Sequence, residues 1–432
     1  MKWCAPVFIV LNMLACNTMS GISQGSSANG AVAAATNIHS IKLYKTGDQI
    51  SFPAIQLGSA DGLELHFDDL DATVKNYYYS FQLCNADWSP SALTTFEYTR
   101  GFQNVRITNY RASSITNSRY IHYQAAVPDR NSYPNRSGNY LLKVFLNNNP
   151  SGILFTKRFV VVDAKASVGT QLLQPYNSLF FRTHQKLQIG VTTDNRIQVF
   201  SPQDLKVVVL QNNNWQTSLY MDRPTIYRGN YYEYSDEGLT AMQAGKEWRW
   251  IDLRSYRLMS DRMASINTRG DTTQVYVKPD VSRNGASYLY YRDINGSYTI
   301  EALENINPFW QGEYGLVHFT YLPPGGQRVA GTDVHLFGEL TNYAANGEGL
   351  MNYSEDKKLY EKTLYLKQGY YNYTYATVSK AAALPDFSTT EGNNWITENS
   401  YVVLVYYRPF GARADELVGY AALNSAFQQN GF

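Results

Sequence analysis

Short runs in which apolar and polar residues alternate recur along most of the chain. Residues 63–70 read LELHFDDL, with Leu63, Leu65 and Phe67 separated by polar residues. Successive side chains of a strand point to opposite faces, so this pattern predicts a half-buried strand. Comparable strand patterns cover residues 76–84, 120–127, 184–193, 204–215 and 273–280.

Turn-forming residues separate these runs. Two apolar strands within residues 137–163 flank an Asn-, Pro- and Gly-rich turn at 147–152, and Asn295-Gly296 predicts a second hairpin. Helical periodicity is scarce, and the best helix candidate is the short segment 415–427. Strands about ten residues apart predict an all-β protein of several consecutive antiparallel β-sandwich domains, immunoglobulin-like or early-set in type.

The pattern also predicts domain boundaries. Residues 21–37 are small and polar and predict a flexible linker. Strands then follow in an N-terminal sandwich (38–165), a middle β domain (166–310) and a C-terminal early-set-like sandwich (311–432).

The composition excludes some classes of function. Of 432 residues, 44% are hydrophobic and 17% charged, and tyrosine is unusually frequent, at 36 residues. The formal net charge of +1 gives no electrostatic footprint for nucleic acid or an anionic membrane surface. Tyrosine suits half-buried sheet faces and wet interfaces, so the composition predicts a β protein that works outside the cytoplasm.

The first twenty residues predict an export signal. Lys2 precedes a short apolar run, too short for a membrane span. Leu14, Ala15 and Cys16 resemble a bacterial lipobox, which makes Cys16 a candidate lipidation site; ordinary cleavage near Ser20 is the alternative.

A row of tyrosines follows Gly369. Tyr371, Tyr373 and Tyr375 occupy alternate positions and share one face of a predicted strand. Such a row can fill a sandwich core or form an exposed platform for a sugar or a protein. Bulky residues on one face of neighbouring strands favour the core.

Residues that could carry chemistry form no convincing constellation. Cys84 lacks an evident partner and is expected to be a buried strand cysteine. Asp68, Asp69 and Asp71 could bind calcium, but without the EF-hand spacing a solvated turn is expected. An interface with a basic partner is a further interpretation of this acidic run.

The histidine, tryptophan and arginine residues give only weak indications of a metal-binding or ligand-binding site. No two histidines have metal-ligand spacing, and His318 and His335 are expected to point away from the core. The six are His39, His66, His122, His184, His318 and His335. Trp88, beside Asp87, is expected to anchor a core or loop. Three arginines are expected on a solvated strand face: Arg100, Arg106 and Arg111.

Two resemblances add to this interpretation. The segments VHLFGELTNY (334–343) and LYEKTLYLKQGYYNYTY (359–375) resemble the early-set sandwich of glycogen- and starch-binding modules. Tyr343 stands where those modules have a Trp. Much of the tyrosine row corresponds to core positions there, so this resemblance implies a fold more than sugar binding.

Over residues 38–424 the chain resembles the plug protein of the bacterial type IX secretion system. The matching stretches include HFDDLDATVKNYYYSFQLCNADWSPS (66–91), RSGNYLLKVF (136–145) and LVYYRPFGARADELVGY (404–420). The resemblance implies a periplasmic protein at the inner face of the outer membrane. It would seal the wide pore of the translocon barrel when no substrate passes.

The sequence therefore predicts a non-enzymatic protein without catalytic, cofactor-binding or metal-binding residues. Its expected partner is the translocon barrel of the type IX secretion system, and it is expected to have no nucleic-acid partner and no transmembrane span. The alternative function is that of a surface or periplasmic glycan-binding lipoprotein. The residues that contact a partner cannot be named from the pattern.

Overall fold

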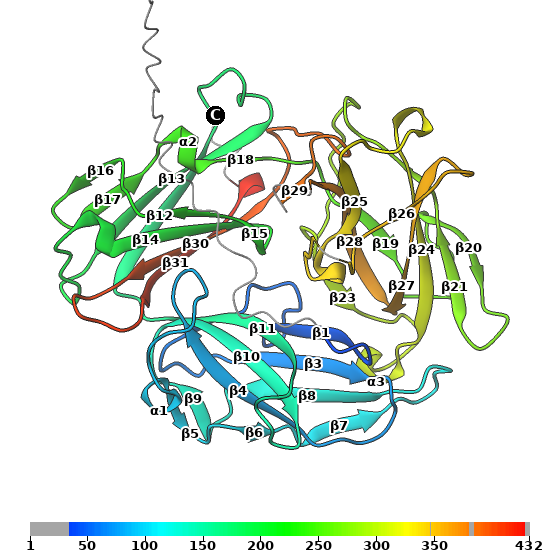
Figure 1. The fold of residues 1–432 in the computed structure, drawn as a ribbon, viewed down its shortest axis with the longest axis horizontal. Coiled ribbons are helices and arrows are strands. Elements are labelled where there is room, and N and C mark those ends of the chain that lie inside the picture. The colour runs from blue at the N-terminus through cyan, green and yellow to red at the C-terminus, as the bar shows by residue number, and fades with distance from the viewer. Residues whose placement is uncertain (1–33, 346, 380–383, 428–432) are drawn as a thin grey trace, which may run out of the picture.

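The computed structural model describes residues 34–345, 347–379 and 384–427. Cys16, the export signal and most of the predicted linker lie outside these residues. The described chain is nearly all β, as predicted, and its strands form three two-sheet units. In Figure 1 the first unit lies beneath the other two, which stand side by side.

The first unit is a sandwich of residues 38–163 with a small ribbon at one end. Its sheets follow the orders β1-β3-β8-β7 and β2-β11-β10-β4-β6, and β5 pairs with β9. The elements are β1 (Ile38–Lys45), β2 (Ala54–Gln56), β3 (Leu63–Asp69), β4 (Tyr77–Cys84), α1 (Thr95–Tyr98), β5 (Thr99–Gly101), β6 (Val105–Arg106), β7 (Asn109–Ala112), β8 (Ile121–Val127), β9 (Ser132–Pro134), β10 (Gly138–Leu146) and β11 (Ile153–Val162). Leu63, Leu65 and Phe67 enter its core, as their alternation predicts.

The middle unit combines residues 166–243 with the last two strands of the chain. Its sheets follow the orders β12-β13-β17-β16, with β18 beside β13, and β15-β14-β30-β31. The elements are β12 (Ala166–Leu173), β13 (His184–Thr193), η1 (Pro202–Asp204), β14 (Leu205–Gln211), β15 (Asn214–Met221), β16 (Ile226–Arg228), β17 (Tyr231–Tyr234), α2 (Glu237–Thr240), β18 (Ala241–Gln243), β30 (Ser400–Tyr407), β31 (Glu416–Asn424) and η4 (Ser425–Phe427).

The third unit, residues 249–391, is a sandwich inserted between β18 and β30. One sheet has the order β19-β28-β23, with β25 and β29 beside β28; the other has the order β20-β21-β24-β27-β26, with β22 beside β24. The elements are β19 (Arg249–Asp252), β20 (Met263–Asn267), β21 (Thr273–Val277), β22 (Asp280–Val281), β23 (Tyr298–Ile300), α3 (Pro308–Gln311), β24 (Tyr314–Leu322), η2 (Pro324–Gly326), β25 (Thr332–Phe337), η3 (Glu339–Thr341), β26 (Asn352–Ser354), β27 (Leu359–Lys367), β28 (Gly369–Ser379) and β29 (Pro385–Asp386).

This pairing differs from the expected division at residue 310. That boundary separates β21 from its neighbour β24, and it places β31 in a different domain from β14. The alternating pattern predicts where each strand lies but not which strand it pairs with. Pairing between segments nearly two hundred residues apart, such as β14 and β30, cannot be predicted from the local sequence. We therefore propose the division into 38–163, 166–243 with 400–424, and 249–391.

Two local predictions were wrong. Residues 416–424 form strand β31 rather than a helix, since Val418 and Leu423 enter the core of the middle unit. Asn295 and Gly296 make the predicted turn, both with positive φ, and β23 follows it, but residues 288–292 before the turn form no strand.

The units pack tightly against one another. Val160 and Val162 of β11 lie in one apolar cluster with Val208 of β14 and Leu404 of β30. The outer faces of the first and middle sandwiches therefore share a hydrophobic core. Within the described ranges, no helix is long and apolar enough to cross a membrane.

Candidate functional site

The second face of strand β3 points toward the third unit and carries polar side chains. The alternation that sends Leu65 and Phe67 into the core turns His66 and Asp68 the other way. Both polar side chains are nevertheless buried, because the third unit covers this face of the sheet. We call the charged and polar contacts between these two units the polar junction.

Asp68 is the centre of the polar junction. Its Oδ2 accepts hydrogen bonds from Lys367 Nζ at 2.5 Å and from the Tyr314 hydroxyl at 2.6 Å. Its Oδ1 lies 2.7 Å from His122 Nδ1. Burial raises the pKa of Asp68, but Lys367 and His122 outweigh it and hold the pKa below its usual value.

Two histidines extend this cluster. His66 Nδ1 lies 3.1 Å from His122 Nε2, and both rings stack on Phe309 of α3. Burial, together with the neighbouring His122, lowers the pKa of His66 to about 3. His66 is therefore neutral at physiological pH and acts as a stacking and hydrogen-bonding group.

A second buried ion pair joins the same units. Lys42 Nζ on β1 lies 2.7 Å from a carboxylate oxygen of Glu339 and donates to the carbonyl of Tyr298 at 2.8 Å. The ammonium also lies 4.2 Å from the centre of the Tyr298 ring, within cation–π range. Lys42 of the first unit thus pairs with a carboxylate of the third unit, and Lys367 of the third unit pairs with a carboxylate of the first.

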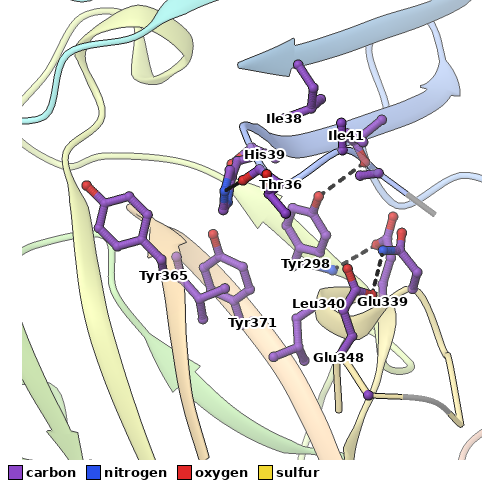
Figure 2. A pocket seen from close by; sticks show the side chains of 16 residues that line it. Thr36, Ile38, His39, Ile41, Tyr298, Glu339, Leu340, Glu348, Tyr365 and Tyr371 are labelled. Carbon is purple, nitrogen blue, oxygen red and sulfur yellow. Dashed lines mark hydrogen bonds between the residues drawn. The ribbon is translucent and has the colours of Figure 1, made fainter. Parts of the chain in front are cut away.

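A pocket of about 470 Å³ opens beside Lys42 and Glu339. Figure 2 shows His39 of β1 on one side of it and Tyr365, Tyr371 and Glu348 of the third unit on the other. The Tyr371 hydroxyl donates to the carbonyl of Lys367 at 2.7 Å. The lining mixes aromatic rings with carboxylates that already have partners, and among the described residues that line it no nucleophile is paired with a base.

A third buried charge network lies inside the third unit. The Asp280 carboxylate accepts from Arg249 Nη1 at 2.7 Å and from the hydroxyls of Tyr373 and Tyr375 at 2.8 and 3.0 Å. Arg249 Nε also donates to Glu391 at 3.0 Å. Every one of these groups is compensated, so the network stabilises the sandwich without exposing a reactive group.

The tyrosine row belongs to this interior. Tyr371, Tyr373 and Tyr375 are buried in the core of the third unit, which confirms the core interpretation. Their rings cannot form a platform for a sugar. Tyr343, at the position of the module tryptophan, is also largely covered and packs edge-on against Phe337.

The acidic run and His335 differ from expectation. Asp68 and Asp69 are buried rather than solvated, and only Asp71 is exposed. Asp69 accepts from the Tyr77 hydroxyl at 2.9 Å and pairs with Lys75. His335 is buried too, contrary to the prediction that it points outward. In the part of the chain that the structure describes, no group of three metal-ligating residues could hold an ion.

The other predicted residues lie where their patterns indicated. Cys84 is buried on β4, and burial raises the pKa of its thiol to about 12. Trp88 is buried between Trp215 and the guanidinium of Arg158. Arg100, Arg106 and Arg111 are exposed.

The sequence pattern does not single out the two junction lysines. Lys42 lies between Ile41 and Leu43, and Lys367 ends the alternating strand 359–367. Alternation places both side chains on outer faces, where solvent is the default expectation. Only the docking of one unit on another buries them, and no local pattern encodes that event.

Comparison with solved structures reveals a similar protein. A hypothetical protein from Parabacteroides merdae ATCC 43184 is 29% identical and superimposes with a TM-score of 0.87. The match covers 91% of this chain and 98% of that chain, so the arrangement of all three units recurs there. The comparison with curated proteins gave no match.

Comparison with protein families gives a match within the first unit. One of its sheets contains β1, β3 and β8, which carry the first unit's side of the polar junction. Residues 38–163 match the family model described as type 9 secretion system plug protein, first domain.

Proposed function

We propose that this protein is a non-catalytic component of the type IX secretion system. It plugs the periplasmic mouth of the outer-membrane translocon barrel while the barrel is idle. The observation that carries this proposal is the match of residues 38–163 to the plug family. The export signal expected at the N-terminus is consistent with a periplasmic location.

The packing of the units supports a plugging role. A plug for a wide pore must keep its shape against thermal motion and solute pressure. The apolar cluster of β11, β14 and β30 joins the first unit to the middle one, and the polar junction joins it to the third. Buried pairs tolerate little displacement, because separating them leaves an uncompensated charge.

The experiment begins with the tagged full-length chain in its own envelope. We expect the translocon barrel to co-purify with it from a detergent extract. Deleting the gene is expected to leave the barrel assembled but leaky, so that large antibiotics or dyes cross the outer membrane. Re-expression of the wild-type chain should restore the barrier.

Two results would contradict the proposal. One is a deletion strain that stays as impermeable as the parent although the barrel is present. The other is loss of polysaccharide uptake in that strain, together with a sugar-dependent rise in the melting temperature of the purified protein. The second result would favour the glycan-binding alternative.

A further inference from the structure

The connection between β12 and β13 is unusually long and carries exposed apolar side chains. Residues 174–183 join two paired strands of the middle unit, whereas hairpin loops commonly have two to five residues. Tyr176 is 82% exposed, Leu179 78% and Phe181 46%. The connection lies beside β18 at the end of the unit (Figure 1). We call residues 174–183 the apolar loop.

The apolar loop has a defined conformation. The Glu237 carboxylate of α2 accepts the backbone N–H groups of Tyr176 and Asn177 at 2.7 and 2.8 Å. The carbonyl of Asn177 accepts the N–H groups of Phe180 and Phe181, both at 2.9 Å. These bonds hold the three apolar side chains outward before any partner arrives, which lowers the entropy cost of binding.

The charges of the loop are arranged around its tip. Glu237 faces inward and lies 3.8 Å from Lys186, whose ammonium also lies 4.6 Å from the Tyr176 ring centre. Residues 176–181, YNSLFF, contain no charged side chain, and the exposed Arg182 follows directly. An apolar tip with an aromatic ring and a flanking cation matches the boundary between acyl chains and phosphate headgroups.

The size of this surface favours lipid over protein. Three partly exposed side chains present a few hundred Å² at most, well below the ~800 Å² per partner of a stable protein interface. The lumen of a membrane barrel is polar and would not receive an apolar tip. A few apolar side chains do suffice for reversible attachment to a bilayer.

We propose that the apolar loop inserts into the interfacial region of a phospholipid bilayer. Leu179 and Phe181 enter the acyl boundary, Tyr176 lies at headgroup depth, and Arg182 contacts phosphate. This binding goes beyond the proposed function and does not depend on it. It would orient the whole molecule, with the middle unit's β12–β13 end against the membrane.

Flotation of the full-length protein with vesicles of phosphatidylethanolamine and phosphatidylglycerol tests the proposal. We expect the wild-type chain to float with the vesicles. The vesicle-bound fraction of the Leu179→Asp/Phe181→Asp variant should be at least about tenfold lower than that of the wild type, because the variant no longer transfers two apolar side chains out of water. The matched control is Ile306→Asp, an equally drastic change at a side chain that is 99% exposed on the third unit. It should float like wild type.

Each other outcome overturns the proposal. A wild-type chain that does not float refutes it, as does equal flotation of the double variant with an unchanged melting temperature. If the wild type fails to float and the double variant loses the co-purifying barrel, the loop contacts protein instead. If flotation fails while barrel binding is intact, the lipid inference falls and the proposed plug function stands.

Discussion

Asp68 illustrates how a residue on an outer strand face becomes part of an interior. In the isolated first unit its carboxylate would be hydrated, and so would the ammonium of Lys367 on the third unit. Docking removes water from both, which is costly, and the contacts with Lys367, Tyr314 and His122 offset that cost. The pair therefore adds more to the specificity of docking than to its strength.

Replacing Asp68 tests this account. We expect Asp68→Asn to lower the free energy of unfolding by ~3–5 kcal/mol, since it leaves the buried Lys367 ammonium without a counter-charge. Denaturant unfolding of the full-length chain measures the change. Asp71→Asn is the matched control: Asp71 is exposed, its pair with Lys75 lies at the surface, and a loss of under about 1 kcal/mol is expected. Equal losses in the two variants would contradict the buried-charge account.

Two substitutions of Tyr373 distinguish the contribution of its ring packing from that of its hydroxyl. Tyr373→Ala should destabilise the protein by ~3–5 kcal/mol, as large aromatic truncations in cores do. Tyr373→Phe keeps the ring and loses the hydrogen bond donated to Asp280 and the one accepted from Arg262 Nη2, so a smaller loss of ~1–2 kcal/mol is expected. Thermal or denaturant melts of both variants give the comparison. A stable, well-folded Tyr373→Ala chain would show that the ring is not a core element.

At the scale of elements, alternation predicted strands well and their partners poorly. The core faces of β3, β13 and β28 follow directly from their sequences, because a strand's periodicity is local. Strand β31 is an exception, since Leu417, Val418, Ala421 and Ala422 fall near helical spacing and favour a helix. Antiparallel pairing with β30, from Ser400 to Tyr407, holds this segment as a strand. This contact is tertiary, so the local sequence does not predict it.

The candidate site was predictable only in part. The acidic run 68–71 stands out in the sequence, but the partner that compensates buried Asp68 is Lys367, 299 residues away along the chain. Tyr371, Tyr373 and Tyr375 were assigned to a core because neighbouring strands share their face. Residues on the outer faces of sandwiches carry no equivalent signal, so sequence cannot tell a solvated face from a docked one.

Two buried carboxyls lie where the chain passes between the middle and third units. Glu247 follows β18 and lies beside Glu398, whose N–H donates to it at 3.2 Å; Asp293 accepts from the N–H of Trp248. Burial raises the pKa of each carboxyl to about 7, although Tyr288 and Arg283 oppose this shift at Glu247. One Glu247 oxygen, Oε2, has no hydrogen-bond partner among the residues that the structure describes.

These carboxyls predict a pH dependence of defined sign. A folded pKa near 7, above the ordinary 4.5 of Glu247, means that the folded state binds the proton more tightly than the unfolded state. The stabilisation is complete below pH 4.5 and is lost as the pH rises to about 7. Glu247→Gln should therefore be increasingly more stable than wild type between pH 5 and 8.

The difference between the two chains reports the titration of Glu247 together with that of Asp293, whose pKa the charge of Glu247 helps to raise. Buried His66 and His122 have lowered pKa values and titrate in both chains, so their contributions cancel. Unfolding free energies at pH 5, 6, 7 and 8 provide the measurement. A difference that stays constant over this range would mean that Glu247 ionises normally.

At the scale of the whole molecule, the first unit contacts the other two in different ways. With the middle unit it shares an apolar cluster and buried hydrogen bonds, such as the one from the Tyr406 hydroxyl to Asn139 at 2.6 Å, and with the third unit it shares buried ion pairs. Apolar faces tolerate small shifts, whereas ion pairs fix one geometry. The third unit is also covalently inserted, with its entry after β18 and its exit before β30, so it cannot swing on a single linker.

The return of the chain to the middle unit gives the last prediction. Truncation after Glu398 removes β30 and β31, which occupy one side of β14 and contribute Val403, Val405 and Val418 to the core of the middle unit. We expect amide hydrogens in 205–221 to lose protection from exchange while those in 314–322 and 369–379 keep it, because the third unit has all its strands. Truncation after Phe427 is the control and should leave both regions protected. If instead 314–379 lost protection and 205–221 kept it, the last strands would belong with the C-terminal sandwich that the alternation pattern predicted.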